Sequence, residues 1–236
     1  MRATCLATLF VVAIASRSAR ADGLIYRLPE DGTSVNYDME ITSSKDGEDR
    51  SLAGRLSISS VGTTTVDKEP CRWLEFKTVV RDGTLDRHAV AKVLIPERYL
   101  GKGQAPGEHL IRGWVKDGES RPLEIKDLMD PVAGGLLLYL AGPAKHPEKL
   151  EPAPVDSRVG KIRAGGVAGD FEFARRTVVV KARFETRLAD QSPFGAIASS
   201  WKFERTNDGR LVEAGTIKLS LAEVRTDAST DLPDRD

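Results

Sequence analysis

The chain has 236 residues, of which 40% are hydrophobic and 30% are charged, with 35 basic and 35 acidic side chains. This balance excludes the strongly basic surface that nucleic-acid-binding proteins use and the polybasic segments of membrane-surface proteins. We therefore expect no nucleic acid partner and no contact with a lipid surface through basic residues.

The first 21 residues have the pattern of a secretory signal peptide. Arg2 supplies a basic start, an uncharged and mainly apolar run extends over residues 3–15, and Ala19-Arg20-Ala21 is a small-x-small cleavage site. The run is shorter than the roughly 20 apolar residues that span a bilayer. We therefore expect export to the periplasm or the extracellular space, cleavage after Ala21, and a mature chain that does not span a membrane.

Asp-Gly pairs and alternating segments predict an antiparallel β domain. Asp-Gly tolerates the positive φ angles of tight hairpin turns. Apolar and polar residues alternate along the segments near these pairs, which is typical of strands with one dry face and one wet face. Such strands belong to antiparallel sheets, and we expect about nine or ten of them. The pairs lie at 31–32, 46–47, 82–83, 117–118 and 208–209, and the segments include 35–41, 52–59, 74–78, 178–188, 201–204 and 217–221.

Residues 123–141 depart from this alternation and have the spacing of helices. Leu123 to Met129 show helical spacing, and Asp130-Pro131 has the form of an N-cap followed by proline at the first helical position. The residues that follow are apolar on nearly all sides of the predicted helix, which indicates that other parts of the protein cover it. We expect one or two short central helices here.

The segment 143–154 contains four prolines and predicts an extended connector. It could separate two domains, but each half would then expose one apolar sheet face with little to cover it. We favour a single β-rich domain over residues 22–226, with the helical insert near 123–141 inside it. Residues 227–236 are expected to form a flexible tail.

No motif in the sequence carries recognisable catalytic or metal-binding chemistry. His88, His109 and His146 are too far apart to supply the close pair of ligands that zinc sites usually contain. No Gly-x-Ser-x-Gly elbow occurs. The glycine-rich residues 101–107 precede a strand-like segment rather than the helix that a phosphate-binding loop needs. We therefore predict no enzymatic activity, no cofactor and no metal. Cys71 is expected to be a buried thiol.

The layout of the mature chain resembles the periplasmic half-barrel carriers of the lipoprotein-carrier (LolA/LolB-like) type. The features that carry the resemblance are long alternating segments with one dry face, an apolar helical region midway, and export without a disulfide. The resemblance implies a mainly β (α+β) fold, in which one large curved antiparallel sheet wraps around the central helices. It also implies an apolar groove, which would be lined by Trp114, Leu136, Leu137, Tyr139, Phe184 and Trp201.

Two functions remain open from the sequence. The first is an exported binding protein that holds a lipid or another apolar ligand in the concave face of the sheet. The alternative is a non-catalytic envelope interaction domain, in which the same apolar residues fill an ordinary core and a strand edge or helix surface docks to another envelope protein. Phe194, in the turn at residues 192–195, plugs the open end of the sheet in one interpretation and contacts a ligand in the other.

Overall fold

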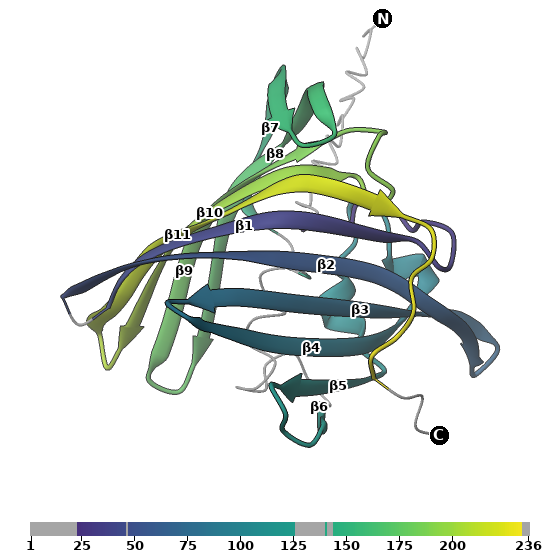
Figure 1. The fold of residues 1–236 in the computed structure, drawn as a ribbon, viewed down its shortest axis with the longest axis horizontal. Helices are drawn as coiled ribbons and strands as arrows, with labels where there is room; N and C mark the ends of the chain where they lie inside the picture. Colours follow the sequence, from purple (N-terminus) through teal and green to yellow (C-terminus); the bar gives the residue numbers. More distant parts are fainter. Residues whose placement is uncertain (1–22, 46, 126–139, 141–143, 233–236) are drawn as a thin grey trace, which may run out of the picture.

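The computed structural model describes residues 23–45, 47–125, 140 and 144–232, and these residues are mainly β (Figure 1). Eleven strands and two short 3-10 helices follow one another along the chain. They are β1 (Ser34–Lys45), β2 (Glu48–Val66), β3 (Glu69–Asp82), β4 (Leu85–Pro96), η1 (Glu97–Tyr99), η2 (Pro106–His109), β5 (Arg112–Asp117), β6 (Leu123–Ile125), β7 (Lys145–Ser157), β8 (Gly160–Arg175), β9 (Val178–Leu188), β10 (Ala196–Asn207) and β11 (Arg210–Arg225).

All eleven strands belong to one antiparallel sheet with the order β6-β5-β4-β3-β2-β1-β11-β10-β9-β8-β7. The sheet is curved and is not closed into a barrel, because β6 and β7 remain as its two edges (Figure 1). The predicted mainly β class with one large antiparallel sheet is confirmed, with eleven strands rather than nine or ten. The described residues contain no α-helix, so the expected central helices have no counterpart among them.

Turns join strands at four of the Asp-Gly pairs that the sequence singles out, and also at three places without such a pair, between β2 and β3, β7 and β8, and β8 and β9. Gly47, Gly83 and Gly209 have φ angles of 83°, 63° and 74°, in the region that glycine adopts without strain. The turn between β2 and β3 uses Asp67 and Lys68, whose φ angles are both positive. This pair contains no glycine, so the Asp-Gly pattern could not reveal it.

Alternation divides the sheet into an inner and an outer face. The inner face carries Tyr37 of β1, which lies opposite Leu56 of β2 and Leu221 of β11. Directly opposed residues share a face, so the register extends this apolar face across the sheet. A single row of opposed residues on it runs through Leu52, Ile41, Ile217, Trp201, Phe184 and Gly169.

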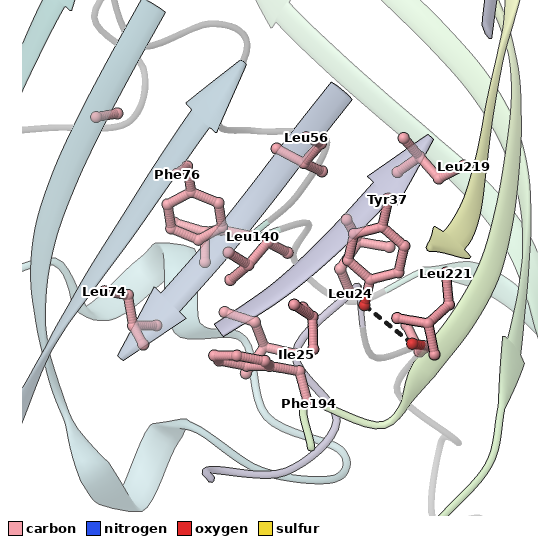
Figure 2. Packing of buried hydrophobic residues seen from close by; sticks show 14 of the residues in the cluster. Leu24, Ile25, Tyr37, Leu56, Leu74, Phe76, Leu140, Phe194, Leu219 and Leu221 are labelled. Atoms are coloured by element: carbon pink, nitrogen blue, oxygen red, sulfur yellow. Dashed lines mark hydrogen bonds between the residues drawn. The ribbon is translucent and has the colours of Figure 1, made fainter. Parts of the chain in front are cut away.

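One part of the inner face is covered by segments that lie outside the sheet. We call the buried apolar residues of these segments, together with the strand residues they pack against, the first cluster. Leu24 and Ile25 precede β1, Phe194 lies in the turn before β10, and all three are buried against the strands (Figure 2). Leu140 is buried among the same residues. The Tyr37 hydroxyl donates a hydrogen bond of 2.9 Å to the Ala196 carbonyl, and burial raises the pKa of Tyr37. Because Phe194 is fully buried among these residues, its ring packs as part of the core.

The structure corrects the prediction for the proline-rich segment 143–154. Residues 145–154, assigned to a connector, belong to strand β7 at an edge of the sheet. Proline cannot donate a backbone hydrogen bond and is tolerated at edges and bulges. The register with β8 shifts between Lys145 and Glu148 and between Leu150 and Ala153, and Pro147 and Pro152 lie within these shifts. The edge strand β7 therefore accommodates Pro147 and Pro152 at irregularities in its pairing with β8.

The helical insert near 123–141 falls mostly outside the described residues. Its first three residues, Leu123–Ile125, form strand β6 and pair with β5, which corrects the prediction for them. Residues 126–139 and 141–143 are not described, so the predicted helices are not tested. Ile125, Leu140 and Ala144, which are described, all pack against inner-face residues of the sheet.

The segment 226–232 crosses the outer face of β3 and β4, where a flexible tail was expected (Figure 1). Glu75 accepts hydrogen bonds from the Thr230 hydroxyl at 2.7 Å and from the backbone N–H groups of Asp231 and Leu232. The Lys92 ammonium donates to the Leu232 carbonyl at 3.2 Å. Leu232 is 2% exposed. We call residues 226–232 the C-terminal strap. Residues 233–236 are outside the described part.

Replacing Glu75 by alanine should release the strap. Glu75 is 3% exposed and its charged carboxylate holds three donors, and hydrogen bonds to charged groups each contribute about 1.5–3 kcal/mol. We expect Glu75→Ala to lower the free energy of unfolding in urea titrations by at least the value of one such bond, about 1.5–3 kcal/mol, and to speed amide exchange at Asp231 and Leu232. Glu119→Ala, at an exposed loop residue, is the control. Unchanged exchange at both amides would contradict the role of Glu75.

Candidate functional site

A second apolar cluster lies on the inner face of β8 to β11, and we call it the aromatic cluster. Its buried members are Phe184 and Trp201, with Ala182 beside them. The rings of Phe184 and Trp201 stack at a centroid distance of 4.7 Å and an interplanar angle of 26°. Further residues pack around them: Ala144, Val167, Phe171, Phe203 and Ile217.

Strand alternation places these side chains together. Trp201 lies opposite Phe184 on one side and opposite Ile217 on the other, and Phe203 lies opposite Ala182. The residues between them in sequence, Lys202 and Arg183, therefore face the outer side of the sheet. Ile217 packs against the first cluster as well, so it connects the two apolar regions.

Glycines make room for the rings of this cluster. A Cβ atom on Gly215 would lie 3.0 Å from a ring carbon of Phe203 and 2.4 Å from the Thr42 carbonyl oxygen. A Cβ atom on Gly169 would lie 2.6 Å from the methyl group of Ala144 and 3.7 Å from the Phe184 ring. Glycine in a strand interior often marks a close approach of other groups to the backbone, and here the approaching groups include Phe203, Phe184 and Ala144 of the aromatic cluster.

Three polar side chains lie at or next to the aromatic cluster on the inner face. Trp201 is 1% exposed, and its indole Nε1 has no hydrogen-bond partner. Ser199 and Thr186 lie opposite one another, two residues along from Trp201 and Phe184 on the same face, and their hydroxyl oxygens are 3.0 Å apart. Ser199 also donates to the Glu185 carbonyl at 3.3 Å. The two hydroxyl groups are thus satisfied locally, whereas the indole N–H is not.

The structure brings together only part of the predicted groove. Phe184 and Trp201 are neighbours in the aromatic cluster. Trp114 faces the opposite side of the sheet, because it lies opposite Lys92, which lies opposite Glu75 on the outer face. It packs near Trp73 at 5.3 Å and is 8% exposed. The remaining three predicted residues, Leu136, Leu137 and Tyr139, lie outside the described residues.

Sequence reasoning did not nominate Phe171, Thr186 or Ser199 for the site. Phe171 could have been found, because it alternates with charged neighbours as the other inner-face residues do. Thr186 and Ser199 carry no such signal, since serine and threonine are mostly exposed in folded proteins. Their placement depends on the register between β9 and β10.

The outer face of the same strands borders a groove of about 1030 Å³, whose lining also includes Phe171, Ala182 and Phe203 of the aromatic cluster. One of its sides is the row of opposed residues Thr42, Thr216, Lys202, Arg183, Asp170 and Lys145. Some of its charged residues form ion pairs: Arg183 bonds Glu148 at 3.0 Å, and Lys145 bonds Glu172 at 2.8 Å. The Lys145 bond lowers the pKa of the Glu172 carboxyl. Exposed pairs of this kind contribute little to stability or recognition.

Reactive side chains are few in the part of the chain that the structure describes. No group of three or more His, Cys, Asp or Glu residues there could hold a metal ion. Cys71 is buried, and burial raises the pKa of its thiol, which disfavours the reactive thiolate. His109 stacks on Tyr99 at 3.4 Å, and His146 lies 3.4 Å from Asp170 at the surface.

Across the described ranges, no helix has the length and apolar character needed to cross a bilayer. This finding concerns helices alone.

Comparisons with known proteins give weak structural likenesses. No protein-family model and no curated protein sequence matches the chain. A protein of YmcC-like fold from Bacteroides fragilis is 8% identical over 85% of this chain and 99% of that one, with a TM-score of 0.36. A DUF1329 family protein from Desulfovibrio piger is 10% identical over 86% of this chain and 88% of that one, with a TM-score of 0.31.

A β-barrel-like protein of the domain of unknown function DUF1849 from Brucella abortus is also similar. It is 10% identical over 85% of this chain and 98% of that chain, with a TM-score of 0.24. Values this low carry no family assignment and no argument about function, which therefore rests on the geometry of this chain.

A methyl group at residue 215 should disturb the cluster measurably. Gly215→Ala would bring its Cβ atom into the Thr42 carbonyl and the Phe203 ring, and overpacking of this kind costs about 1–3 kcal/mol. Gly101→Ala is the matched control, because nothing lies within 4 Å of a Cβ atom there. Thermal or urea unfolding should show the loss for residue 215 and a change within about 0.5 kcal/mol for residue 101. Equal unfolding midpoints would contradict the packing described.

Proposed function

We propose that this protein is an exported binding protein that holds a lipid or similar apolar ligand against the aromatic cluster. The observation that carries the proposal is the inner face of an open, curved sheet, where Phe184 and Trp201 stack inside a continuous apolar surface. Ligand pockets in proteins are predominantly lined by hydrophobic and aromatic side chains with a few placed polar groups. The composition of this cluster fits that description.

The ligand would lie toward β8 to β10 rather than along the whole inner face. Leu24, Ile25 and Phe194 fill the first cluster and belong to the chain itself. In the aromatic cluster, every described member except Ala144 comes from the sheet strands. The proposed site is therefore shorter than the groove that the sequence implies, and it excludes Trp114.

Export is part of the proposal and rests on the first 21 residues. Their basic start, apolar run and Ala-Arg-Ala site are the three parts of a signal peptide. The site at the aromatic cluster does not depend on the compartment. Mass spectrometry of the intact protein from its native cells should give a chain that begins at Asp22, and a chain that retains Met1 would contradict export.

A non-catalytic envelope interaction domain is the second candidate function. The first cluster favours it, because Leu24, Ile25, Leu140 and Phe194 are buried as in an ordinary filled core. In that case the aromatic cluster also belongs to the core, and neutral apolar molecules find no site. Direct ligand binding separates the two functions.

Binding of a neutral apolar dye tests the proposal. N-phenylnaphthylamine should gain fluorescence on mixing with the protein, saturate at one site, and be displaced by monooleoylglycerol. Ala182→Phe adds a ring between Phe203 and Phe171, the residues opposite Ala182. It should weaken dye binding at least about tenfold, because the added ring would occupy the space that the proposed site offers to the dye, and close-packed side chains leave little room to shift.

Ala198→Phe is the matched control for this substitution. Ala198 lies on β10 as well, but on the outer face opposite Ser220 and Arg187. It should leave dye binding within about twofold of the wild type, a change near the scale of ordinary surface substitutions. If the folded wild-type protein shows no saturable dye binding, the ligand-binding function is wrong and the interaction domain is favoured.

A further inference from the structure

We propose that the ligand is an uncharged acyl ester or amide, and that its carbonyl oxygen accepts a hydrogen bond from Trp201 Nε1. This inference rests on the proposed function and names the chemical class of its ligand. Two observations carry it: an indole donor buried without an acceptor, and the lack of charged side chains among the described members of the aromatic cluster.

The indole N–H of Trp201 is a donor that no residue in the described ranges satisfies. Indole nitrogen can donate but cannot accept, and the N–H of a buried tryptophan usually finds a partner. Trp201 is 1% exposed and has none. Leaving a buried donor unpaired is costly, so the position favours any molecule that brings an acceptor to it.

Three hydroxyl groups on the inner face, those of Tyr37, Thr186 and Ser199, are satisfied by the chain. Tyr37 donates to the Ala196 carbonyl, and Thr186 and Ser199 bond each other. The remaining buried side-chain atom without a partner in the described part of the chain is Ser192 Oγ, which neighbours Tyr37 beside the filled first cluster. Trp201 thus differs from the rest of the inner face, because its unpaired group lies in the aromatic cluster.

The distribution of charged side chains favours a ligand whose hydrogen-bond acceptor is uncharged. The members of the aromatic cluster are all apolar apart from the indole N–H of Trp201. The charged residues of the same strands, Arg183, Lys202 and Glu204, face the outer groove. A carboxylate placed at Trp201 would be a buried charge with a single neutral donor, which is strongly unfavourable. An ester or amide carbonyl accepts the same hydrogen bond without that penalty.

The hydroxyl pair offers a second polar contact beside Trp201. Ser199 donates to the Glu185 carbonyl, and its oxygen lies 3.0 Å from that of Thr186. Each hydroxyl oxygen has two acceptor lone pairs, so the pair retains acceptor capacity toward the inner face. A ligand hydroxyl near its ester group, as in a monoacylglycerol, would match both contacts.

Trp201→Phe tests the inference, because it keeps an aromatic ring and removes the donor. Three competitors of N-phenylnaphthylamine with equal chain length are compared: monooleoylglycerol, octadecene, and oleate at alkaline pH, where the acid is ionised. The substitution should lower the affinity for monooleoylglycerol about 5- to 10-fold, which corresponds to the loss of one hydrogen bond. The affinity for octadecene should stay within about twofold of the wild-type value. Wild-type protein should bind oleate more weakly than the ester.

The matched control is Trp73→Phe, on the outer face beside Trp114, which should change none of the three affinities. In wild-type protein, the indole proton resonance of Trp201 should move downfield with the ester and stay in place with octadecene. This second measurement tests the hydrogen bond even if Trp201→Phe does not fold.

The outcomes separate this inference from the proposed function. If Trp201→Phe lowers the affinities for the ester and for octadecene equally, or lowers neither, the role of Trp201 Nε1 is overturned while ligand binding stands. Tighter binding of oleate than of the ester overturns the uncharged class. If no competitor displaces the dye and the dye itself does not bind the wild type, the proposed function fails first.

Discussion

Pairing between β1 and β11 is the contact on which the rest of the structure depends. Every other neighbouring pair in the sheet joins strands that are consecutive in sequence, so β1 to β6 and β7 to β11 would otherwise be two separate meanders. Twelve residues of β1 are in register with β11, including Tyr37 with Leu221 and Met39 with Leu219. This pairing makes one inner face and places Ile217, which packs against both clusters, opposite Ile41.

Both ends of the described chain strengthen this central junction. Ile25 forms a bridge to Gly195, and Leu24 and Ile25 are buried against the inner face just before β1 begins. On the outer face, the C-terminal strap leaves β11 and is held on β3 and β4 by Glu75 and Lys92. The first cluster is therefore tied on both sides of the sheet. The proposed site lies beyond it, where the described contacts come mainly from the sheet strands.

The sequence predicts the strands well because their signal is local. Alternation along residues 35–41 or 178–188 is visible without knowledge of the partner strand, and Asp208-Gly209 marks its hairpin by backbone preference alone. The face of Trp114 could not be predicted this way. Its outer row is also buried, with Lys92 at 0% and Glu75 at 3% exposure under the strap, so apolar character no longer identifies the inner face. The prolines of β7 led to the prediction of a connector, because the sequence does not show that this segment is an edge strand, where prolines are tolerated. The unpaired Trp201 Nε1 follows from packing between distant segments and has no local signal.

Native mass spectrometry of the protein purified from its own cells tests the central claim most directly. The account predicts a complex in which one uncharged acyl ester or amide adds its mass to the polypeptide, and this mass should be lost on exchange with excess monooleoylglycerol. A polypeptide that carries no added mass, and gains none after incubation with monooleoylglycerol, would contradict it.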